Sequence, residues 1–433
     1  MPFHWSSTLL RKGIPGSGLI RSLTQKSIPF ISSILRVQES EECLTIETNN
    51  SESYSYPFLW LRDNCQCPQC FNSSSQSRSS FLRDLPPSVK PSAIQVKGSG
   101  LKAQITWNDG HESTFESQWL LDRVFSDHVD KQVGKRSEPT VWDASYKSTL
   151  MTFDYEEILT KKSTMLEWLQ SLDTMGLTMI SGMPPEVKSL PTLIEAVAFP
   201  RSTHYGQYFE VIAKAQPNNT AYTTSELSLH LDLPYYKYKP GTQFLHCIKQ
   251  FEGQGGDNRF VDGLKIAQIL ARSEPKHWNT LKTVPVTYWD YGSEDMVGRY
   301  LKFNSVPTFE LDRSGRRIHR INYSDQVRAS HQNVPLAQVT PLYQALIAFS
   351  QIANSPQNCF SLKLSPGQCV VFDNLRVLHS REGFTQSCGN DHEPQNDLNG
   401  GPQFPKSRHI HGAYIDWDEI ESRMNVLKLE KQD

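Results

Sequence analysis

Several features are missing from this 433-residue sequence, and each absence excludes a class of protein. No run of about 18 apolar residues occurs, so the sequence predicts no membrane span. The net charge is −2 and no long basic run occurs beyond the N-terminus, so the charge pattern does not support a nucleic-acid partner. Hydrophobic residues make up 37% and charged residues 21%, which is typical of a globular protein. The length predicts one large domain and a smaller one.

Acidic residues are absent from the first 38 positions, which are rich in serine and carry five basic residues. That composition is typical of a mitochondrial presequence, and the compact apolar block of a secretory signal is missing. We therefore expect residues 1–35 to be a presequence and the protein to be mitochondrial. The alternative is a disordered basic arm on a cytoplasmic protein.

The composition of the rest of the chain changes at two places, which mark expected domain boundaries. Short alternating segments separated by Gly, Ser and Asn predict a small β-rich domain at 36–126. A polar stretch of mixed charge at 127–150 predicts a linker, and residues 151–433 form the expected larger domain. Within it, residues 385–407 are rich in Gly, Asn, Gln and Pro and indicate a flexible loop, which we interpret as an insertion rather than a lid. Helices are expected at about 154–172, 189–198, 263–272 and 338–353, and buried strands at 243–248 and 368–372.

Three of the eight cysteines cluster at Cys65, Cys67 and Cys70, and His111 follows 41 residues later. Without a secretory signal, a disulfide framework is not expected. Three thiolates and one imidazole can close a tetrahedral structural zinc site, which leaves no position open for catalysis. The alternative is a set of free thiols.

A second group of potential metal ligands is dispersed along the chain. His230 and Asp232 lie two residues apart, so on a strand both side chains would share one face. His379 ends an apolar run that begins at Val370. Two histidines and a carboxylate leave three adjacent positions open, as non-haem iron(II) oxygenases require for a chelating cosubstrate and dioxygen. A core histidine at 379 is the alternative, and the spacing alone does not decide between them.

From about residue 36 to 426, motifs in this sequence resemble the γ-butyrobetaine and trimethyllysine dioxygenase family of Fe(II)/2-oxoglutarate oxygenases. These motifs are Trp60-Leu61-Arg62-Asp63-Asn64, residues 218–224 leading into Leu227-Ser228-Leu229-His230-Leu231-Asp232, residues 245–250, Val261-Asp262-Gly263, Phe372-Asp373-Asn374 with Leu378-His379, Ser407-Arg408-His409, and residues 412–418.

The resemblance implies an α+β, mainly β protein. Its catalytic domain would be a double-stranded β-helix, or jelly roll, with flanking helices, beside a small β-rich zinc-binding N-terminal domain. The implied Fe(II) ligands are His230, Asp232 and His379. Arg408 would pair with the distal carboxylate of 2-oxoglutarate, with Asn258 contacting the same group and Arg381 as the nearest rival for the pairing.

Aromatic faces suit a quaternary ammonium group, which has no N–H to donate. The resemblance places such a cage at Tyr205, Phe209, Tyr222 and Tyr414, and Asn219 on the substrate carboxylate, although rings at these positions could equally be ordinary core residues. The chain departs from the family in three places. Phe209 stands where a Trp is expected, Leu233 where a Tyr is, and Ser324 where an Asn is.

The implied reaction is hydroxylation of γ-butyrobetaine to L-carnitine by O2 and 2-oxoglutarate, with release of succinate and CO2. Zn(II) would be structural, ascorbate the reductant, and the protein a homodimer. One alternative is hydroxylation of trimethyllysine or another quaternary ammonium acid by the same chemistry. An alternative of another class is a non-catalytic metal-binding scaffold.

Overall fold

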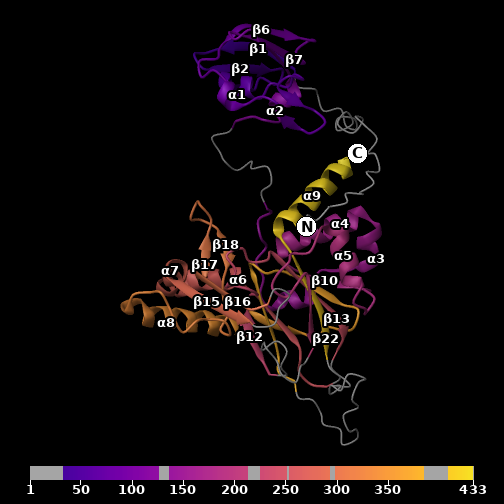
Figure 1. Ribbon diagram of the computed structural model, residues 1–433, viewed down its shortest axis with the longest axis vertical. Coiled ribbons are helices and arrows are strands. Elements are labelled where there is room, and N and C mark those ends of the chain that lie inside the picture. Colours follow the sequence, from indigo (N-terminus) through magenta and orange to yellow (C-terminus); the bar gives the residue numbers. More distant parts are fainter. Residues whose placement is uncertain are drawn as a thin grey trace, which may run out of the picture. The chain divides into compact units, whose positions relative to one another are not determined.

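The computed structural model describes residues 33–125, 136–212, 225–250, 253–292, 298–384 and 408–432. The chain divides into two compact units, Met1–Val133 and Gly134–Asp433 (Figure 1). Most of the expected presequence, residues 1–32, lies outside the described residues, as does the segment 385–407. Among the helices that are described, none is long and apolar enough to cross a membrane.

The first unit contains two three-stranded antiparallel sheets, β1-β2-β3 and β6-β7-β8. Alternate residues of β2 and β7 are buried, including Ile46, Ile105 and Trp107, so each sheet contributes one face to a shared core. The elements are β1 (Ile34–Glu39), β2 (Cys43–Thr48), β3 (Ser53–Pro57), α1 (Phe58–Asp63), β4 (Phe71–Asn72), β5 (Ser77–Arg78), η1 (Leu82–Asp84), β6 (Pro91–Lys97), β7 (Lys102–Trp107), β8 (Glu112–Glu116) and α2 (Ser117–Leu121).

The second unit is built on two larger sheets. A six-stranded sheet has the order β11-β22-β13-β20-β10-β9, and a four-stranded sheet has the order β12-β21-β14-β19. Their strands are β9 (Thr152–Asp154), β10 (Leu177–Ser181), β11 (Tyr208–Ile212), β12 (Leu227–His230), β13 (Thr242–Lys249), β14 (Asn258–Asp262), β19 (Cys359–Leu362), β20 (Cys369–Asp373), β21 (Val377–Arg381) and β22 (His409–Ile415).

The six-stranded sheet is buried on both faces, and its side chains alternate between two cores. Leu245 and Phe372 pack with Phe260 of the four-stranded sheet, in a core that residues of both sheets share. Phe244 and Val371 face the other way, into a core that includes residues of α3 (Tyr155–Thr160), α4 (Lys162–Met175), α5 (Ser189–Val197) and α9 (Trp417–Gln432). Two facing sheets with mainly antiparallel, non-sequential strand order form the expected jelly roll.

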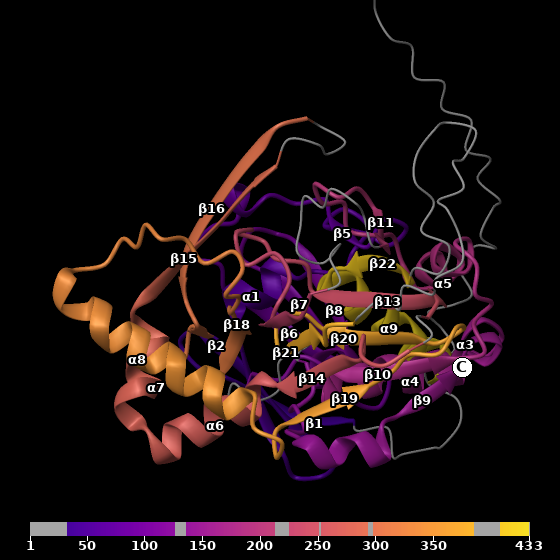
Figure 2. The same ribbon diagram turned by 90° about the horizontal axis from the view of Figure 1, so that it is seen from below.

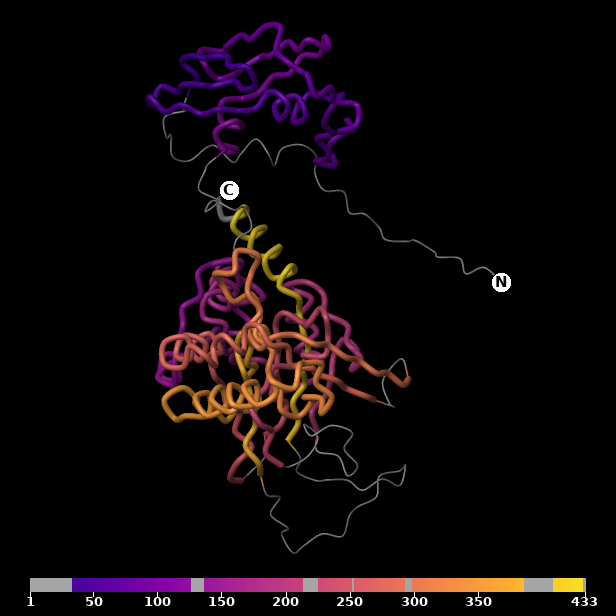
Figure 3. The backbone as a smooth tube through the Cα atoms, turned by 90° about the vertical axis from the view of Figure 1, so that its left-hand side faces the viewer, coloured from indigo at the N-terminus to yellow at the C-terminus, as the bar shows by residue number. Residues whose placement is uncertain are grey.

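A helical and ribbon segment is inserted between β14 and β19. It contains α6 (Gly263–Ser273), α7 (Pro275–Thr283), β15 (Pro285–Gly292), β16 (Tyr300–Pro307), β17 (Phe309–Leu311), β18 (Ile318–Ile321) and α8 (Leu336–Ala353). In Figure 2, β15 and β16 form a long two-stranded ribbon that extends away from the sheets. Helices α7 and α8 pack side by side, seen in orange tones in Figure 3.

Local structure differs from the sequence expectations in three places. The helix expected at 154–172 is two helices, α3 and α4, which meet at Lys161. Residues 136–150, expected as linker, include the 3-10 helix η2 (Ala144–Thr149) and the buried side chains of Trp142 and Tyr146. The apolar run that begins at Val370 is divided by a turn, so His379 lies within a separate strand, β21.

Candidate active site and cysteine cluster

His230, Asp232 and His379 meet on the four-stranded sheet of the second unit, and we call them the metal trio. Strand β12 pairs with β21 so that His230 lies opposite His379, with ring centroids 4.2 Å apart. Strand β12 ends at His230, and Asp232 lies in the bend that follows, not on the strand as the spacing suggested. The ligand atoms still converge, because one Asp232 carboxylate oxygen lies 3.2 Å from His230 Nε2 and 3.8 Å from His379 Nε2.

Hydrogen bonds fix the orientation of two members of the trio. His230 Nδ1 lies 2.8 Å from the carbonyl oxygen of Ser228, which can only accept, so Nδ1 carries the proton and Nε2 has a free lone pair. Tyr414 donates its hydroxyl to the second carboxylate oxygen of Asp232 at 2.6 Å. The backbone of Asp232 is held on both sides by the Asn374 side chain.

Electrostatics favour a neutral imidazole and a charged carboxylate here. Burial and the neighbouring His230 lower the pKa of His379 to about 3. Burial raises the pKa of Asp232, but the interactions with His230, His379 and Tyr414 outweigh it and lower that pKa below its usual range. Deprotonated nitrogen and oxygen donors are what a divalent cation requires.

The metal trio lines a cavity that is partly open to solvent. Arg408 and Asn258 lie in its wall, and Arg408 donates to the Asn258 side-chain oxygen at 3.0 Å. Arg408 is only 5% exposed, and within the part of the chain that is described no acidic side chain lies within ion-pair distance of it. Burial and the nearby Arg381 lower the pKa of Arg408 to about 10.

Three buried polar atoms in the wall of this cavity lack a hydrogen-bond partner among the described residues. These atoms are Arg408 Nε, Asn258 Nδ2 and Gln243 Oε1. Leaving such groups unpaired costs roughly 1–3 kcal/mol each, and more for a charged group. A buried carboxylate ligand would remove that cost for the two donors, Arg408 and Asn258.

Aromatic side chains line the cavity beside the metal trio. Tyr205, Phe209 and Tyr414 form what we call the aromatic wall, with ring centroids 6.2 Å apart for the first pair and 5.2 Å for the second. Gly412 makes this spacing possible, because a Cβ at that position would lie 2.2 Å from the Phe209 ring. Asn219 and Tyr222 fall outside the described residues, so the structure does not place them.

The two other substituted positions also line the cavity. Leu233 is buried and has a left-handed backbone, φ 58°, directly after the bend at Asp232. A branched apolar residue rarely adopts that conformation, so its presence beside potential metal ligands indicates a constraint on the turn. Ser324 donates to Gln326, whose amide in turn donates to the Ser228 hydroxyl at 2.7 Å.

Sequence reasoning missed several residues of this cavity. Tyr235, Gln243 and Gln326 all lie in the wall, and Asn374 supports Asp232 from behind. Asn374 belongs to the quoted motif Phe372-Asp373-Asn374, and Gln243 lies two residues before the motif at 245–250, so both had a usable sequence signal. Tyr235 and Gln326 carry none, because only the folding of the 231–240 and 322–329 segments brings them to the site.

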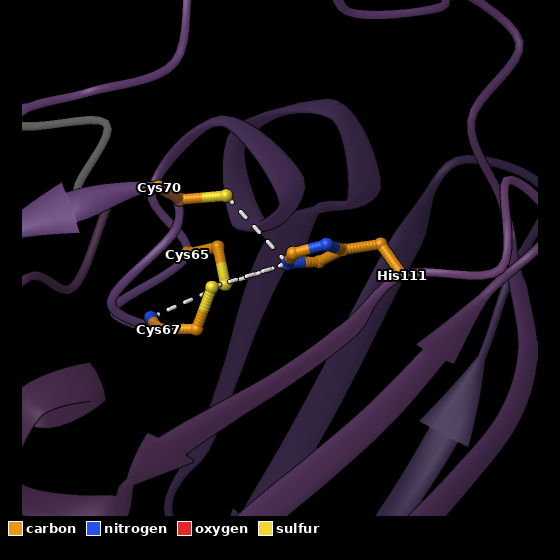
Figure 4. Close-up of side chains that lie close together, drawn as sticks. All are labelled: Cys65, Cys67, Cys70 and His111. Carbon is orange, nitrogen blue, oxygen red and sulfur yellow. Dashed lines mark hydrogen bonds between the residues drawn. The ribbon is translucent and has the colours of Figure 1, made fainter.

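The four residues of the cysteine cluster, Cys65, Cys67, Cys70 and His111, converge in the first unit (Figure 4). The cysteines lie between α1 and β4, and His111 follows the turn between β7 and β8 at Gly110, φ 81°. His111 Nε2 lies 3.2, 3.5 and 3.6 Å from the three sulfurs, in chain order. A tetrahedral zinc ion with ordinary bond lengths would place nitrogen and sulfur about 3.6 Å apart.

Two further residues support this cluster. Arg62 approaches the Cys70 sulfur at 3.6 Å and pairs with Asp109 at 3.0 Å, and Asp109 accepts the backbone N–H of His111. Burial, followed by Arg62, lowers the pKa of His111, which favours its neutral, ligating form. The cluster therefore has the donors and the supporting contacts of a closed four-ligand metal site.

Both units of the chain match known dioxygenase families. The family described as Taurine catabolism dioxygenase TauD, TfdA matches residues 135–413, and Gamma-butyrobetaine hydroxylase-like, N-terminal matches residues 35–121. Gamma-butyrobetaine dioxygenase of Homo sapiens is 32% identical over 88% of this chain and 92% of its own length. That of Pseudomonas sp. is 29% identical over 93% and 98%. Mitochondrial trimethyllysine dioxygenase of Bos taurus is 28% identical over 81% and 83%.

A family match over more than half of the chain, together with relatives that span both units, establishes the family and the chemistry that goes with it. The expected resemblance is thereby confirmed, and the non-catalytic alternative is set aside. The chain belongs to the TauD, TfdA family, in the group of γ-butyrobetaine and trimethyllysine dioxygenases, and is an Fe(II)- and 2-oxoglutarate-dependent dioxygenase.

Proposed function

We propose that this dioxygenase hydroxylates γ-butyrobetaine to L-carnitine, with release of succinate and CO2. The observation that carries the proposal is a single cavity lined by the metal trio, by a buried Arg408 that lacks an acidic partner among the described residues, and by the aromatic wall. The most similar relatives reported above include two named γ-butyrobetaine dioxygenase, which supports the same substrate.

His230, Asp232 and His379 are the proposed iron ligands. Their donor atoms lie within 4.8 Å of one another, and two nitrogens with one carboxylate suit a non-haem iron(II) centre with open positions. When bound, Fe(II) with 2-oxoglutarate and O2 supplies oxidative decarboxylation to succinate and CO2, with one oxygen atom going to succinate and the other into a substrate C–H bond.

Arg408 and Asn258 are the proposed ligands of the distal carboxylate of 2-oxoglutarate. A guanidinium in a water-poor wall can hold a carboxylate through two parallel hydrogen bonds, which fixes the orientation of the cosubstrate as well as its affinity. Asn258 already accepts one Arg408 N–H, and its own amide N–H groups remain available to the same carboxylate.

The protein must also bind the substrate that is hydroxylated, here called the prime substrate, and exclude water from the site. The aromatic wall of Tyr205, Phe209 and Tyr414, with Tyr222 from the segment that is not described, is proposed to receive the trimethylammonium group. Tyr414 would serve twice, since its hydroxyl also keeps Asp232 oriented. Asn219 is proposed to bind the substrate carboxylate.

Trimethyllysine, or another quaternary ammonium acid, is the second candidate. The observation that favours it is the loss of two expected polar side chains, which leaves Leu233 and the Ser324–Gln326 pair in the cavity wall. Leu233 cannot hydrogen-bond to a carboxylate as Tyr would, and the Ser324 hydroxyl already donates to Gln326, so this part of the wall holds a small carboxylate less well.

Succinate release separates these candidates. The purified protein, with Fe(II), 2-oxoglutarate and ascorbate as the proposed reductant, is incubated with γ-butyrobetaine, with trimethyllysine, or with neither. We expect the fastest succinate release with γ-butyrobetaine, and its loss in His230→Ala. Equal rates in all three incubations would reject the betaine proposal, and a preference for trimethyllysine would select the second candidate.

The cysteine cluster is proposed to bind a structural Zn(II). Four protein ligands leave no open position, so the ion would stabilise the first unit and take no part in turnover. The distances from His111 to the three sulfurs support zinc, because they lie close to the separation that a tetrahedral ion imposes.

Two further proposals concern assembly and location. A homodimer is proposed from the family resemblance, and analytical ultracentrifugation tests it. Mitochondrial import is proposed from the composition of residues 1–35, and relatives named mitochondrial trimethyllysine dioxygenase support it. Because β1 begins at Ile34, deletion of residues 2–32 should abolish import of a fluorescent fusion and leave the fold intact. Unchanged mitochondrial fluorescence would reject the presequence.

A further inference from the structure

Behind the aromatic wall lies a second ring cluster that the proposed function does not use. His204 and Tyr205 occupy the corner of a tight turn closed by two hydrogen bonds between Thr203 and Gly206. The two rings are in contact, with centroids 3.9 Å apart and planes tilted by 42°, so His204 packs directly against Tyr205. His204 itself is only 4% exposed and hydrogen-bonds to the Tyr236 hydroxyl at 2.8 Å.

An acidic side chain sits at the centre of this cluster. Asp290, on β15, accepts the Tyr300 hydroxyl at 2.9 Å and lies 3.8 Å from His204 Nε2. The Tyr235 hydroxyl, which lies 3.5 Å from the same histidine nitrogen, interacts with Asp290 as well. Tyr235 also lines the active-site cavity, so a ring that interacts with this carboxylate faces the cavity.

Two tyrosine hydroxyls surround the Asp290 carboxylate. Burial raises the pKa of Tyr235 well above its ordinary value, with Tyr205 and Asp290 adding to the shift, so its hydroxyl stays protonated. Tyr300 is likewise a hydroxyl donor. The side chain of Asp290 is about one-quarter exposed, so solvent reduces its field without removing it.

One nearby cation opposes this charge. Lys302 lies opposite Asp290 on β16, but its ammonium group is placed over the rings of Tyr236 and Tyr300, 5.1 and 4.9 Å from their centroids. No ion pair within 4.0 Å joins Lys302 to Asp290 among the described residues. The two charges form no direct ion pair, and the Lys302 ammonium group offsets part of the field of the Asp290 carboxylate.

We propose that Asp290 is a specificity-determining residue that selects a positively charged prime substrate. Its carboxylate, held behind the aromatic wall by His204, Tyr235 and Tyr300, attracts a quaternary ammonium group that binds against that wall. The rings supply contact and the carboxylate supplies net charge, which a ring quadrupole lacks. The inference rests on the proposed function, since that function places the cation at the wall.

The discriminating experiment compares γ-butyrobetaine with 5,5-dimethylhexanoate, its isostere in which carbon replaces the charged nitrogen. In the full-length enzyme with Fe(II) and 2-oxoglutarate, Asp290→Asn should raise the KM for γ-butyrobetaine about tenfold, as expected for one charge at an intermediate dielectric. The inhibition constant of the neutral isostere should change less than about twofold. An equal loss for both compounds would overturn the inference, because a purely structural role predicts it.

Two more variants control for damage to the fold. Asp290→Glu keeps the charge and should restore most of the affinity for γ-butyrobetaine. Lys302→Met removes the opposing cation and should lower that KM about two- to threefold, a gain that a damaged fold would not produce. An unchanged or raised KM in Lys302→Met would count against the inference, even where Asp290→Asn fails to fold.

Binding of tetramethylammonium, measured by calorimetry without O2, separates this inference from the proposed function. We expect binding about tenfold weaker in Asp290→Asn than in the unmodified protein. If γ-butyrobetaine and trimethyllysine are not turned over but tetramethylammonium binding still depends on Asp290, the proposed function fails and the inference stands. If betaine is turned over but binding is indifferent to Asp290, the inference fails alone.

Discussion

The two groups of potential metal ligands in this chain are built in opposite ways. In the cysteine cluster, three ligands come from six consecutive residues and the fourth from a hairpin turn, so all four positions around an ion are supplied by side chains. In the metal trio, His230 and Asp232 lie two residues apart and His379 lies 147 residues after Asp232, and the pairing of β12 with β21 brings His379 to the other two. The trio supplies only half of an octahedral shell, beside a large cavity.

The difference teaches what each site depends on. The cysteine cluster holds a small unit together, so loss of its ion should be a folding defect. The trio is positioned by a jelly roll with its own buried cores, so loss of its ion should be a defect of chemistry in a folded protein. Each of the following changes should therefore affect one unit and spare the other.

The largest effect is expected from Cys67→Ser. Structural zinc supplies about 10–16 kcal/mol of folding free energy in small zinc domains, so losing one ligand should unfold the first unit. Limited proteolysis should cleave within residues 33–125, and zinc content should fall, while iron content is kept. Cys43→Ser, at a cysteine outside the cluster, is the matched control. A zinc-free variant of full stability would end the proposal of a structural site.

Asp232→Ala should produce the reverse pattern. Succinate formation that depends on substrate should fall more than about 100-fold, because losing even the outer partners of a metal ligand costs about 10- to 100-fold. Zinc content and protease resistance of the first unit should be unchanged. Metal analysis and succinate assay on the same sample test this, and retained iron with normal turnover would contradict the assignment.

Arg408→Lys tests whether Arg408 binds 2-oxoglutarate in the cavity beside the metal trio. A lysine cannot form the bidentate pair, so the KM for 2-oxoglutarate should rise about 10- to 30-fold, with a smaller change in the KM for γ-butyrobetaine. Arg381→Lys is the control, since Arg381 is also buried in the wall and contacts the Ser225 carbonyl. A larger effect from Arg381→Lys would transfer the role to that residue.

The smallest effect is expected from Gly412→Ala. The added methyl group would meet the Phe209 ring at 2.2 Å and push it out of the aromatic wall. Because one aromatic face contributes on the order of 0.5–2 kcal/mol, the KM for γ-butyrobetaine should rise about threefold or more, while that for 2-oxoglutarate stays constant. Steady-state kinetics in both substrates measure the contrast, and parallel changes would argue against a cage at Phe209.

The fold class could be predicted from the sequence motifs, and the structure brings the residues of both predicted ligand sets together. The metal that each set binds stays a prediction. Cys65, Cys67 and Cys70 lie within six residues, and His230 lies two residues before Asp232. What could not be predicted is set by tertiary pairing. The strand that carries His230 stops there, because Leu231 donates to the Tyr323 carbonyl and Leu233 adopts a left-handed turn, which moves Asp232 off the strand.

Residues that are brought to the cavity only by tertiary contacts could not be identified from the sequence. Tyr235 lines the cavity and Asp290 lies behind it, yet 55 positions separate them in the chain. They meet because the β15–β16 ribbon runs past the segment that follows Asp232, with Asn304 donating to the carbonyls of Pro234 and Tyr236. The substrate end of the cavity therefore depends on an inserted ribbon whose contacts no periodicity reveals.

Strand β22 has a consequence for how sequences of this type can diverge. The strand pairs with β11 on one side and with β13 on the other. Its inward face carries Gly412 and Tyr414, and Arg408 directly precedes its first residue. Two neighbours thus set its register, and the length of the chain that leads into it does not. Changes in the length of the sequence that precedes β22 are therefore expected to leave residues 409–415 in place.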